Sequence, residues 1–248
     1  MTVIPRHCVG YPSPGVPVRV LERPNRFLAI VARAHRKERL PVHVPNPGRM
    51  EELILPGITQ GWIVRARPPG PHRTLFDLVA VRVGAGWVSV DSRIANRLVA
   101  EALRSRRLRR FGEGPWIPEY SLAGCRWDFA LPGTAGRPTS LLEVKSSNLR
   151  VGRTALFPDA PTSRGTHHLE ALTRWARTPA RAGMLFVIQR DDVRRFAPNR
   201  RLDPAFGEAF DRARRAGVRL AAVTTRVRPE GLEWGEFVPV TELELSGK

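Results

Sequence analysis

The segment Ser140-Leu141-Leu142-Glu143-Val144-Lys145-Ser146 alternates between apolar and charged side chains in its second half. Because successive side chains of a β-strand point to opposite faces, Leu142 and Val144 share one face while Glu143 and Lys145 share the other. Lysine is scarce here, with three lysines among the 41 lysines and arginines of the chain. The segment therefore predicts a buried strand that presents an acid and an ammonium group side by side.

A second carboxylate lies upstream, in the alternating segment Arg126-Trp127-Asp128-Phe129-Ala130. Residues 132–138, between the two segments, are rich in proline and glycine and predict a turn. Two neighbouring strands would then bring Asp128 beside Glu143. An aspartate, followed on the next strand by Glu-x-Lys, is the constellation of the metal-dependent PD-(D/E)xK nucleases.

Hydrolysis of a phosphodiester requires an oriented water, compensation of charge on the phosphoryl oxygens and help for the leaving alkoxide. Mg²⁺ or Mn²⁺ held by hard oxygen ligands meets these needs. The sequence predicts Asp128, Glu143 and the carbonyl of Val144 as the metal ligands. Lys145 is expected to orient or activate the water and to stabilise the charge that develops at phosphorus. The alternative interpretation of Glu-x-Lys is a solvated ion pair.

A helix is predicted over residues 93–108, because Ile94, Leu98 and Ala102 recur at four-residue spacing. Glu101 lies two turns after Ile94 on the same apolar stripe, which is expected to pack inward. It is a further candidate catalytic acid, acting on the metal through water or on a second ion. A salt bridge at the rim is the alternative for this residue.

The composition indicates a polyanionic partner. A formal charge of +18 predicts a surface that attracts nucleic acid, although an arginine-rich genome is an alternative cause. The cysteines Cys8 and Cys125 form no disulfide or zinc pattern, no apolar run reaches the length of a membrane span, and residues 1–7 lack a signal-peptide pattern. We expect a cytoplasmic protein with no membrane partner. Many enzymes of this kind are homodimers, but no coiled-coil pattern or exposed apolar stripe argues for one here.

The chain divides into a β-rich first third and a mixed remainder. Strand-like runs at 18–21, 26–34, 42–44, 62–67 and 74–83, with a helical turn near 49–53, predict a closed barrel of the oligonucleotide-binding (OB) type. The remainder alternates predicted strands at 116–122, 124–131, 139–146, 184–189 and 218–224 with helices at 163–177 and 203–216. We predict an α/β protein with an OB-type nucleic-acid-binding domain at 1–86 and a nuclease-like catalytic domain at 87–248.

Phosphate contacts are predicted at the start of the helix over residues 163–177. Arg164 and His168 share one face of its first turns, and the helix N-terminus attracts anions. His167 is a further contact in this cluster, and a zinc site at the adjacent histidines is disfavoured because neighbouring side chains on a helix diverge. Gln189, at the end of a predicted strand, is expected to touch metal-bound water or substrate. Cys125 has no partnered base in the sequence, which disfavours a thiol nucleophile.

The turn over residues 44–50 is a candidate nucleic-acid contact in the first domain. Asn46 and Arg49 are expected to contact the nucleic-acid backbone. The aromatic residues Phe27, Trp62 and Phe76 would stack on bases where they are exposed. A place in the barrel core is the alternative for these three.

Several blocks of the sequence, read in order, resemble the sugar fermentation stimulation protein A (SfsA) family between about residues 18 and 225. They are Arg26-Phe27-Leu28-Ala29, Pro45-Asn46-Pro47-Gly48-Arg49-Met50, Asn96-Arg97-Leu98-Val99-Ala100-Glu101-Ala102-Leu103, Leu142-Glu143-Val144-Lys145, Phe157-Pro158-Asp159-Ala160 and Leu185-Phe186-Val187-Ile188-Gln189-Arg190. The resemblance implies an OB-type barrel joined to a PD-(D/E)xK nuclease domain, in cytosolic proteins that bind DNA and are assigned DNA or RNA cleavage.

The resemblance also implies site residues. By position, Asp128, Glu143 and Lys145 match the nuclease triad of the family, and Glu101 matches an acid in its helix pattern. Arg26 is a further expected nucleic-acid contact. The chain departs from the pattern at His167, where a lysine is usual, at Asn25, where a basic residue is usual, and at 146–148 after the lysine.

Three functions remain open at this point. The leading hypothesis is metal-dependent hydrolysis of phosphodiester bonds in DNA or RNA. A non-catalytic DNA-binding regulator of sugar-metabolism genes is the alternative, because the family name records such a role. A structural factor of a ribonucleoprotein is the third.

Overall fold

The computed structural model describes residues 8–33, 38–66, 74–134 and 137–242. The chain forms two compact units. The first unit runs to Leu98 and adds two later segments, Gln189–Asp192 and Thr224–Gly235, and the rest of the chain makes up the second unit. A single cut along the sequence therefore does not separate the units.

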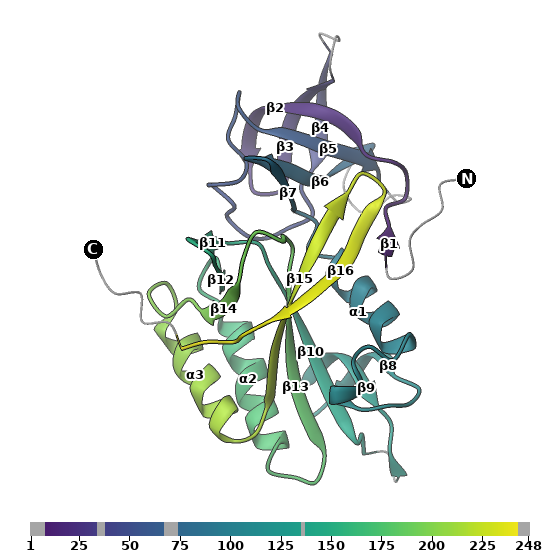
Figure 1. Cartoon of the computed structure of the whole chain (residues 1–248), viewed down its shortest axis with the longest axis vertical. Coiled ribbons are helices and arrows are strands. Elements are labelled where there is room, and N and C mark those ends of the chain that lie inside the picture. The colour runs from purple at the N-terminus through teal and green to yellow at the C-terminus, as the bar shows by residue number, and fades with distance from the viewer. Residues whose placement is uncertain (1–7, 34–37, 67–73, 135–136, 243–248) are drawn as a thin grey trace. The chain divides into compact units, whose positions relative to one another are not determined.

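The first unit contains a closed five-stranded barrel (Figure 1). Its strands are β2 (Val16–Asn25), β3 (Leu28–Arg33), β4 (Arg39–His43), β5 (Gln60–Arg65) and β6 (Phe76–Val83). Antiparallel pairs join them in the order β4-β3-β2-β5-β6, and a parallel contact between His43 and Asp77 closes the ring. This confirms the predicted OB-type barrel.

The barrel interior is filled by small branched and aliphatic side chains. In β2, for example, Val18 and Val20 are buried while Arg19 between them is exposed, as the period of a half-buried strand requires. β7 (Gly86–Ser89) pairs with β6 and extends the same sheet. The first unit thus continues beyond residue 86, where the sequence prediction ended it, because β7 depends on β6 for its hydrogen bonds. β1 (Cys8–Gly10) pairs within this unit with residues 231–233.

The second unit is built on a mixed sheet with strand order β15-β13-β10-β9-β8. The elements after β7 are α1 (Ile94–Arg104), the 3-10 turn η1 (Arg109–Phe111), β8 (Ile117–Leu122), β9 (Cys125–Leu131), β10 (Ser140–Ser147), β11 (Arg150–Val151), β12 (Thr154–Phe157), α2 (Ser163–Trp175), β13 (Arg181–Ile188), β14 (Arg195–Pro198), α3 (Pro204–Arg215), β15 (Arg219–Arg228) and β16 (Gly231–Val238). β10 is central, parallel to β13 and antiparallel to β9. The predicted mixed α/β architecture is confirmed.

Helices α2 and α3 lie side by side, and α2 packs on β13 (Figure 1). One aspartate sets the start of both helices. Asp203 Oδ1 accepts a hydrogen bond from Phe206 N–H at 3.0 Å and caps α3, while its Oδ2 accepts one from Thr162 N–H at 2.8 Å. Thr162 in turn caps α2 through Gly165 N–H at 3.0 Å. The beginning of α2, which carries three predicted site residues, is therefore held in place.

Two features differ from the sequence prediction. Helix α1 ends at Arg104 instead of residue 108, because Arg106 adopts the left-handed conformation, with φ of 59°, which a helix cannot continue through. The short strands β11, β12 and β14 and the glycine-containing β16 were not predicted. Of the helices in the described ranges, none has the length and apolar character that crossing a membrane requires.

Candidate active site

Asp128 and Glu143 come from adjacent antiparallel strands of the second unit. The last paired residues of β9 and β10 are Phe129, which follows Asp128, and Leu142, which precedes Glu143. Beyond this pair, the Asp128 side chain replaces the strand partner, and its Oδ2 accepts a hydrogen bond from Val144 N–H at 2.7 Å. The structure therefore brings Asp128 next to the Glu143–Val144 peptide, as expected from the sequence.

Glu143 is the buried centre of this cluster, with 2% of its surface exposed. Lys145 Nζ contacts Glu143 Oε1, and His168 Nδ1 lies 2.5 Å from the same oxygen. Lys145 shares a face of β10 with Glu143, whereas His168 arrives from α2. The second oxygen, Glu143 Oε2, is buried without a hydrogen-bond partner in the part of the chain that the structure describes. The carboxylate is thus held by one oxygen only.

Glu143 remains ionised in spite of its burial. Burial by itself raises the pKa of a carboxyl group, but the close contact with His168 and the charge of Lys145 act against it and outweigh it. The pKa of Glu143 consequently lies below its ordinary value. A buried anion with two basic partners on one oxygen is a strong acceptor for a further positive group on the other.

The donor set fits a hard divalent cation that the protein binds through a small number of carboxylates. A buried acceptor without a partner costs roughly 1–3 kcal/mol, and a cation at Glu143 Oε2 would offset that cost. Within the described residues, no group of three or more His, Cys, Asp or Glu side chains is arranged to hold a metal. Mg²⁺ usually needs only one or two carboxylates and keeps several waters. Asp128 and Glu143 match that requirement, and the Val144 carbonyl stays a predicted third ligand.

Glu101 is only partly buried in the structure. Its side chain is one-third exposed and forms an ion pair with Arg104, one turn later on α1. Glu101 therefore lies at the edge of the buried stripe, because residues three apart on a helix surface meet and its carboxylate pairs with the exposed Arg104. The alternative of a rim salt bridge describes the observed contact, and a catalytic role for Glu101 stays a prediction.

The predicted phosphate cluster on α2 is split between surface and core. Arg164 and His167 are exposed, and His167 Nε2 lies 3.4 Å from Cys125 Sγ. His168 is 4% exposed and packs on Trp127, with ring centroids 5.5 Å apart. Its prediction as a nucleic-acid contact is corrected, since its ring is turned inward to Glu143.

A sequence signal for the buried position of His168 did exist. The buried residues of α2 are Gly165, His168, Leu169 and Leu172. Their spacing of three, four and seven residues is the apolar stripe of a helix that packs on a sheet. The pattern indicates a core position for His168, but it does not reveal which acid the ring meets there.

Two predicted nucleic-acid contacts are buried and bonded to backbone groups. Asn46 is buried, and its Oδ1 accepts a hydrogen bond from Gly48 N–H at 2.9 Å. Gln189 is fully buried in the first unit, where its Nε2 donates to the carbonyl of Asp91 at 3.0 Å. Their burial does not fit direct contact with nucleic acid, because short polar side chains in turns and at strand ends readily bond nearby backbone. Contact of Gln189 with metal-bound water stays a prediction. Arg26 and Arg49 are exposed, as a nucleic-acid contact requires.

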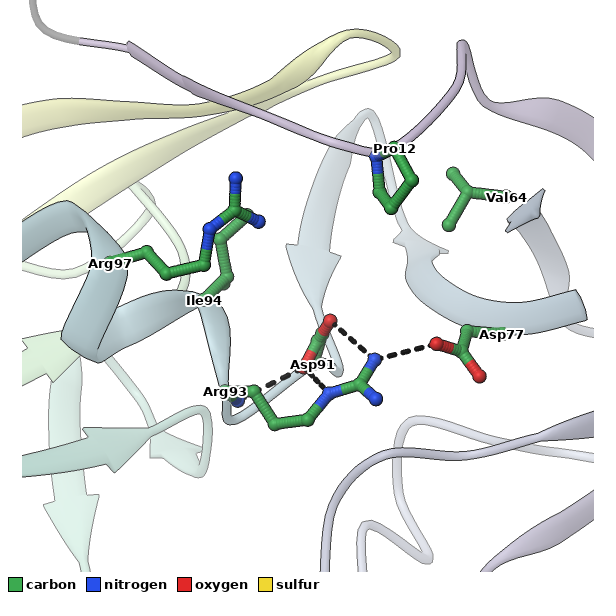
Figure 2. A pocket seen from close by; sticks show the side chains of 7 residues that line it. All are labelled: Pro12, Val64, Asp77, Asp91, Arg93, Ile94 and Arg97. Carbon is green, nitrogen blue, oxygen red and sulfur yellow. Dashed lines mark hydrogen bonds and ion pairs between the residues drawn. The ribbon is translucent and has the colours of Figure 1, made fainter. Parts of the chain in front are cut away.

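A second cluster of charges lies in the first unit. Figure 2 shows the Arg93 guanidinium between Asp91 and Asp77, with Nη2 to Asp77 Oδ2 at 2.6 Å and Nε to Asp91 Oδ1 at 2.9 Å. His43 Nδ1 lies 3.2 Å from Asp77 Oδ1. Burial would lower the pKa of Arg93, but the bonds to both aspartates outweigh it and raise the pKa. The cluster borders a cavity of about 120 Å³, and its carboxylate oxygens are already used by protein groups.

Comparison with known proteins identifies relatives along nearly the whole chain. Residues 93–231 match the family model described as the sugar fermentation stimulation protein RE domain, and residues 21–90 match the SfsA N-terminal OB domain. A sugar fermentation stimulation protein homolog of Symbiobacterium thermophilum is 40% identical over 233 residues, covering 89% of this chain and 92% of the relative. A homolog of Moorella thermoacetica is 38% identical over 222 residues, covering 89% and 94%.

A solved structure shares the fold. The structure of Pyrococcus furiosus SfsA in complex with Ca²⁺ superposes with a TM-score of 0.81 at 25% identity, and the match covers 94% of this chain and 98% of that chain. Family models therefore match both the barrel and the mixed sheet. A solved relative matches the fold. The chain belongs to the sugar fermentation stimulation protein (SfsA) family.

Proposed function

We propose that this protein is a divalent-metal-dependent nuclease that hydrolyses phosphodiester bonds in DNA, RNA or both. The observation that carries the proposal is the pair of carboxylates on β9 and β10 with a lysine on the same face. In this pair, Glu143 keeps one buried oxygen without a partner in the described ranges. An ion pair with a purely structural role would be expected to have partners on both oxygens of the buried carboxylate.

The residues have distinct roles in the proposed reaction. Asp128 and Glu143 would hold Mg²⁺ or Mn²⁺, which supplies charge compensation at phosphorus and a more acidic bound water. Lys145 places a fixed positive charge next to Glu143, where it would orient the attacking water and stabilise the charge of the transition state. His168 would keep the Glu143 carboxylate in one orientation, and so acts as a positioning residue.

Two further observations support the proposal. The Pyrococcus furiosus relative is described in complex with Ca²⁺, a hard cation that prefers the same oxygen ligands as Mg²⁺. The chain carries a formal charge of +18, and a basic protein attracts the polyanionic substrate at long range.

The experiment is a cleavage assay with labelled single- and double-stranded DNA and RNA, in Mg²⁺, Mn²⁺ or EDTA. Products are expected with the metals and none with EDTA. Asp128→Asn and Glu143→Gln should remove cleavage, and Lys145→Ala should lower its rate by roughly 10²–10³-fold. Glu170→Gln is the matched control, since Glu170 is an acid on α2 paired with Arg212 at 3.4 Å and lies outside the proposed site. Cleavage that survives EDTA, or that is equal in Glu143→Gln and Glu170→Gln, would reject the proposal.

A DNA-binding regulator without turnover is the second candidate, favoured by the high positive charge and the barrel. It predicts salt-sensitive binding that is unchanged in Glu143→Gln and no product under any metal condition. The same cleavage assay, combined with a binding measurement, separates the two functions.

A further inference from the structure

The first unit carries one exposed aromatic side chain surrounded by arginines. Among the large hydrophobic side chains in the described ranges, Phe27 is the exposed aromatic one, with 47% of its surface accessible. Two further aromatic residues of this unit, Trp62 and Phe76, are already packed. Trp62 stacks on Trp87 with ring centroids 3.7 Å apart, and Phe76 lies beneath Arg33 at 5.0 Å.

Phe27 sits on a tight turn whose backbone is held on both sides. The turn connects β2 to β3, with Asn25 paired to Leu28. Phe27 N–H donates to Asn25 Oδ1 at 2.8 Å, and Phe27 carbonyl oxygen accepts from Val44 N–H at 2.9 Å. The ring is therefore presented on a fixed backbone, which lowers the entropy lost on binding.

Arginines from two chain segments surround this turn. Arg26 Nη1 donates to the carbonyl of Pro47 at 3.4 Å, and Arg23 Nη1 donates to the carbonyl of Met50 at 3.2 Å. Both bonds reach the segment that contains Arg49, which is exposed. The β2–β3 turn and residues 47–50 consequently form one surface, here called the Phe27 surface, with three positive charges.

The guanidinium of Arg23 is only partly hydrogen-bonded. Its Nε and Nη2 are buried without an acceptor in the described part of the chain. Burial lowers the pKa of Arg23, Glu51 and Glu52 raise it, and the charge of Arg26 lowers it further. The two glutamates leave a net positive balance on this surface, so an anion bound beside Arg26 and Arg49 would also stabilise Arg23.

We propose that the Phe27 surface is a binding subsite for single-stranded nucleic acid, in which the Phe27 ring stacks on one base and Arg26 and Arg49 bind the adjoining phosphates. Base faces are open to an aromatic ring in a single strand but are covered by neighbouring pairs in a duplex, which selects the single strand. Arg23 holds residues 47–50 in place as a positioning residue. This inference rests on the proposed function, because it assumes a nucleic-acid substrate, and it specifies that the substrate is single-stranded.

The test is fluorescence anisotropy with labelled DNA and RNA single strands of about 12 nucleotides and with the matching duplex. It uses the full-length chain with Glu143→Gln in EDTA, so that cleavage plays no part. Phe27→Ala should weaken single-strand binding about tenfold and change duplex binding less than about twofold. Phe27→Trp, which keeps an aromatic ring at this position, should bind the single strand as tightly as the wild-type protein. Ile58→Ala, which removes an exposed apolar side chain elsewhere on the barrel, should have no effect.

The phosphate contacts are tested by the salt dependence of the same binding. Arg26→Ala and Arg49→Ala should each lower the slope of log affinity against log salt by about 0.7 on single strands. Arg82→Ala removes an equal charge from an exposed arginine bonded to Gln60 and Gly84, and it should change the slope less.

The outcome separates this subsite from the proposed nuclease. Unchanged single-strand affinity in Phe27→Ala, or an equal loss on duplex and single strand, would overturn the subsite even if metal-dependent cleavage is observed. A selective loss in Phe27→Ala would support the subsite even if no cleavage is ever detected.

Discussion

Two buried acids, Asp77 in the first unit and Glu143 in the second, have similar basic partners. They differ in whether both carboxylate oxygens are bonded. Asp77 bonds His43 through one oxygen and Arg93 through the other. Glu143 has both of its basic partners, Lys145 and His168, on one oxygen. Its other oxygen is buried without a partner among the described residues.

The difference distinguishes a structural ion-pair network from a candidate reaction centre. A carboxylate with both oxygens occupied has no further capacity for a ligand, and its removal leaves its partners uncompensated. A carboxylate with one buried oxygen that lacks a partner destabilises the folded protein, and a bound cation would offset that cost. Burial and charge alone do not distinguish the two clusters. The number of carboxylate oxygens that have a bonding partner does.

The largest expected effect is on turnover. Lys145→Ala should lower the rate of cleavage by roughly 10²–10³-fold, since it removes a fixed charge that acts on the transition state. Asp77→Asn, in the other cluster, should change the rate per folded molecule less than about twofold. Single-turnover cleavage measures both. A similar loss in the two variants would erase the distinction between the clusters.

The next effect is stabilisation by a divalent cation. At 100 times its Kd, Mn²⁺ should raise the free energy of unfolding by about 2.7 kcal/mol in the wild-type protein. Glu143→Gln should abolish the gain, while Asp77→Asn should keep it. Urea denaturation with and without Mn²⁺ provides the measurement. A gain that persists in Glu143→Gln would place the cation elsewhere.

Replacement of Asp77, whose two oxygens are both bonded, should destabilise the folded protein. Asp77→Asn is expected to lower the free energy of unfolding by about 2 kcal/mol, because it breaks a buried pair whose partner Arg93 is 54% exposed and partly compensated by water. The comparison is Glu22→Gln, which alters an exposed pair with Arg39 and should cost less than about 0.5 kcal/mol. Equal costs, measured in urea without metal, would contradict the prediction.

A weaker effect is expected at acid pH. The pKa of Glu143 is lower in the folded chain than its ordinary value of 4.5. Its stabilising contribution is therefore complete above that value and is lost as the pH falls below it. In EDTA, wild-type protein should lose stability on acidification more steeply than Glu143→Gln. Parallel curves of unfolding free energy against pH would exclude this contribution.

The smallest effect is expected at the exposed start of α2. Arg164→Ala should weaken binding of nucleic acid only about threefold at moderate salt, because it removes one exposed charge. Arg212→Ala, on α3, is the control. Anisotropy in the Glu143→Gln background would detect the change, and a weaker effect of Arg164→Ala than of Arg212→Ala would argue against a phosphate contact there.

Strong local patterns made much of the fold predictable. The alternation in β10 and the cap-and-stripe pattern of α2 specify their elements within a few residues. Strands such as β11 (Arg150–Val151) and β14 (Arg195–Pro198) were missed, because two to four residues are too few to express a period. β11 forms a short hairpin with β12, whereas β14 exists only through pairing with β12, about 40 residues earlier in the chain.

The candidate site was predictable in part for the same reason. Glu143 and Lys145 share a strand face by local geometry, and the hairpin-like link to Asp128 brings the second acid near. His168 could be placed in the core by its stripe, but not against Glu143. Asn46 and Gln189 were assigned to nucleic acid because the sequence does not show which backbone groups satisfy their amides.

The chain's residue order by itself determined the types of its main elements, the joint face of Glu143 and Lys145, and the excess of positive charge, because these depend on neighbours within a few positions. Only the tertiary structure decided which oxygen of Glu143 is occupied, that Asp77 is fully bonded and that Phe27 stays exposed. The reason is physical: hydrogen-bond satisfaction and burial depend on groups that folding brings together from distant parts of the chain.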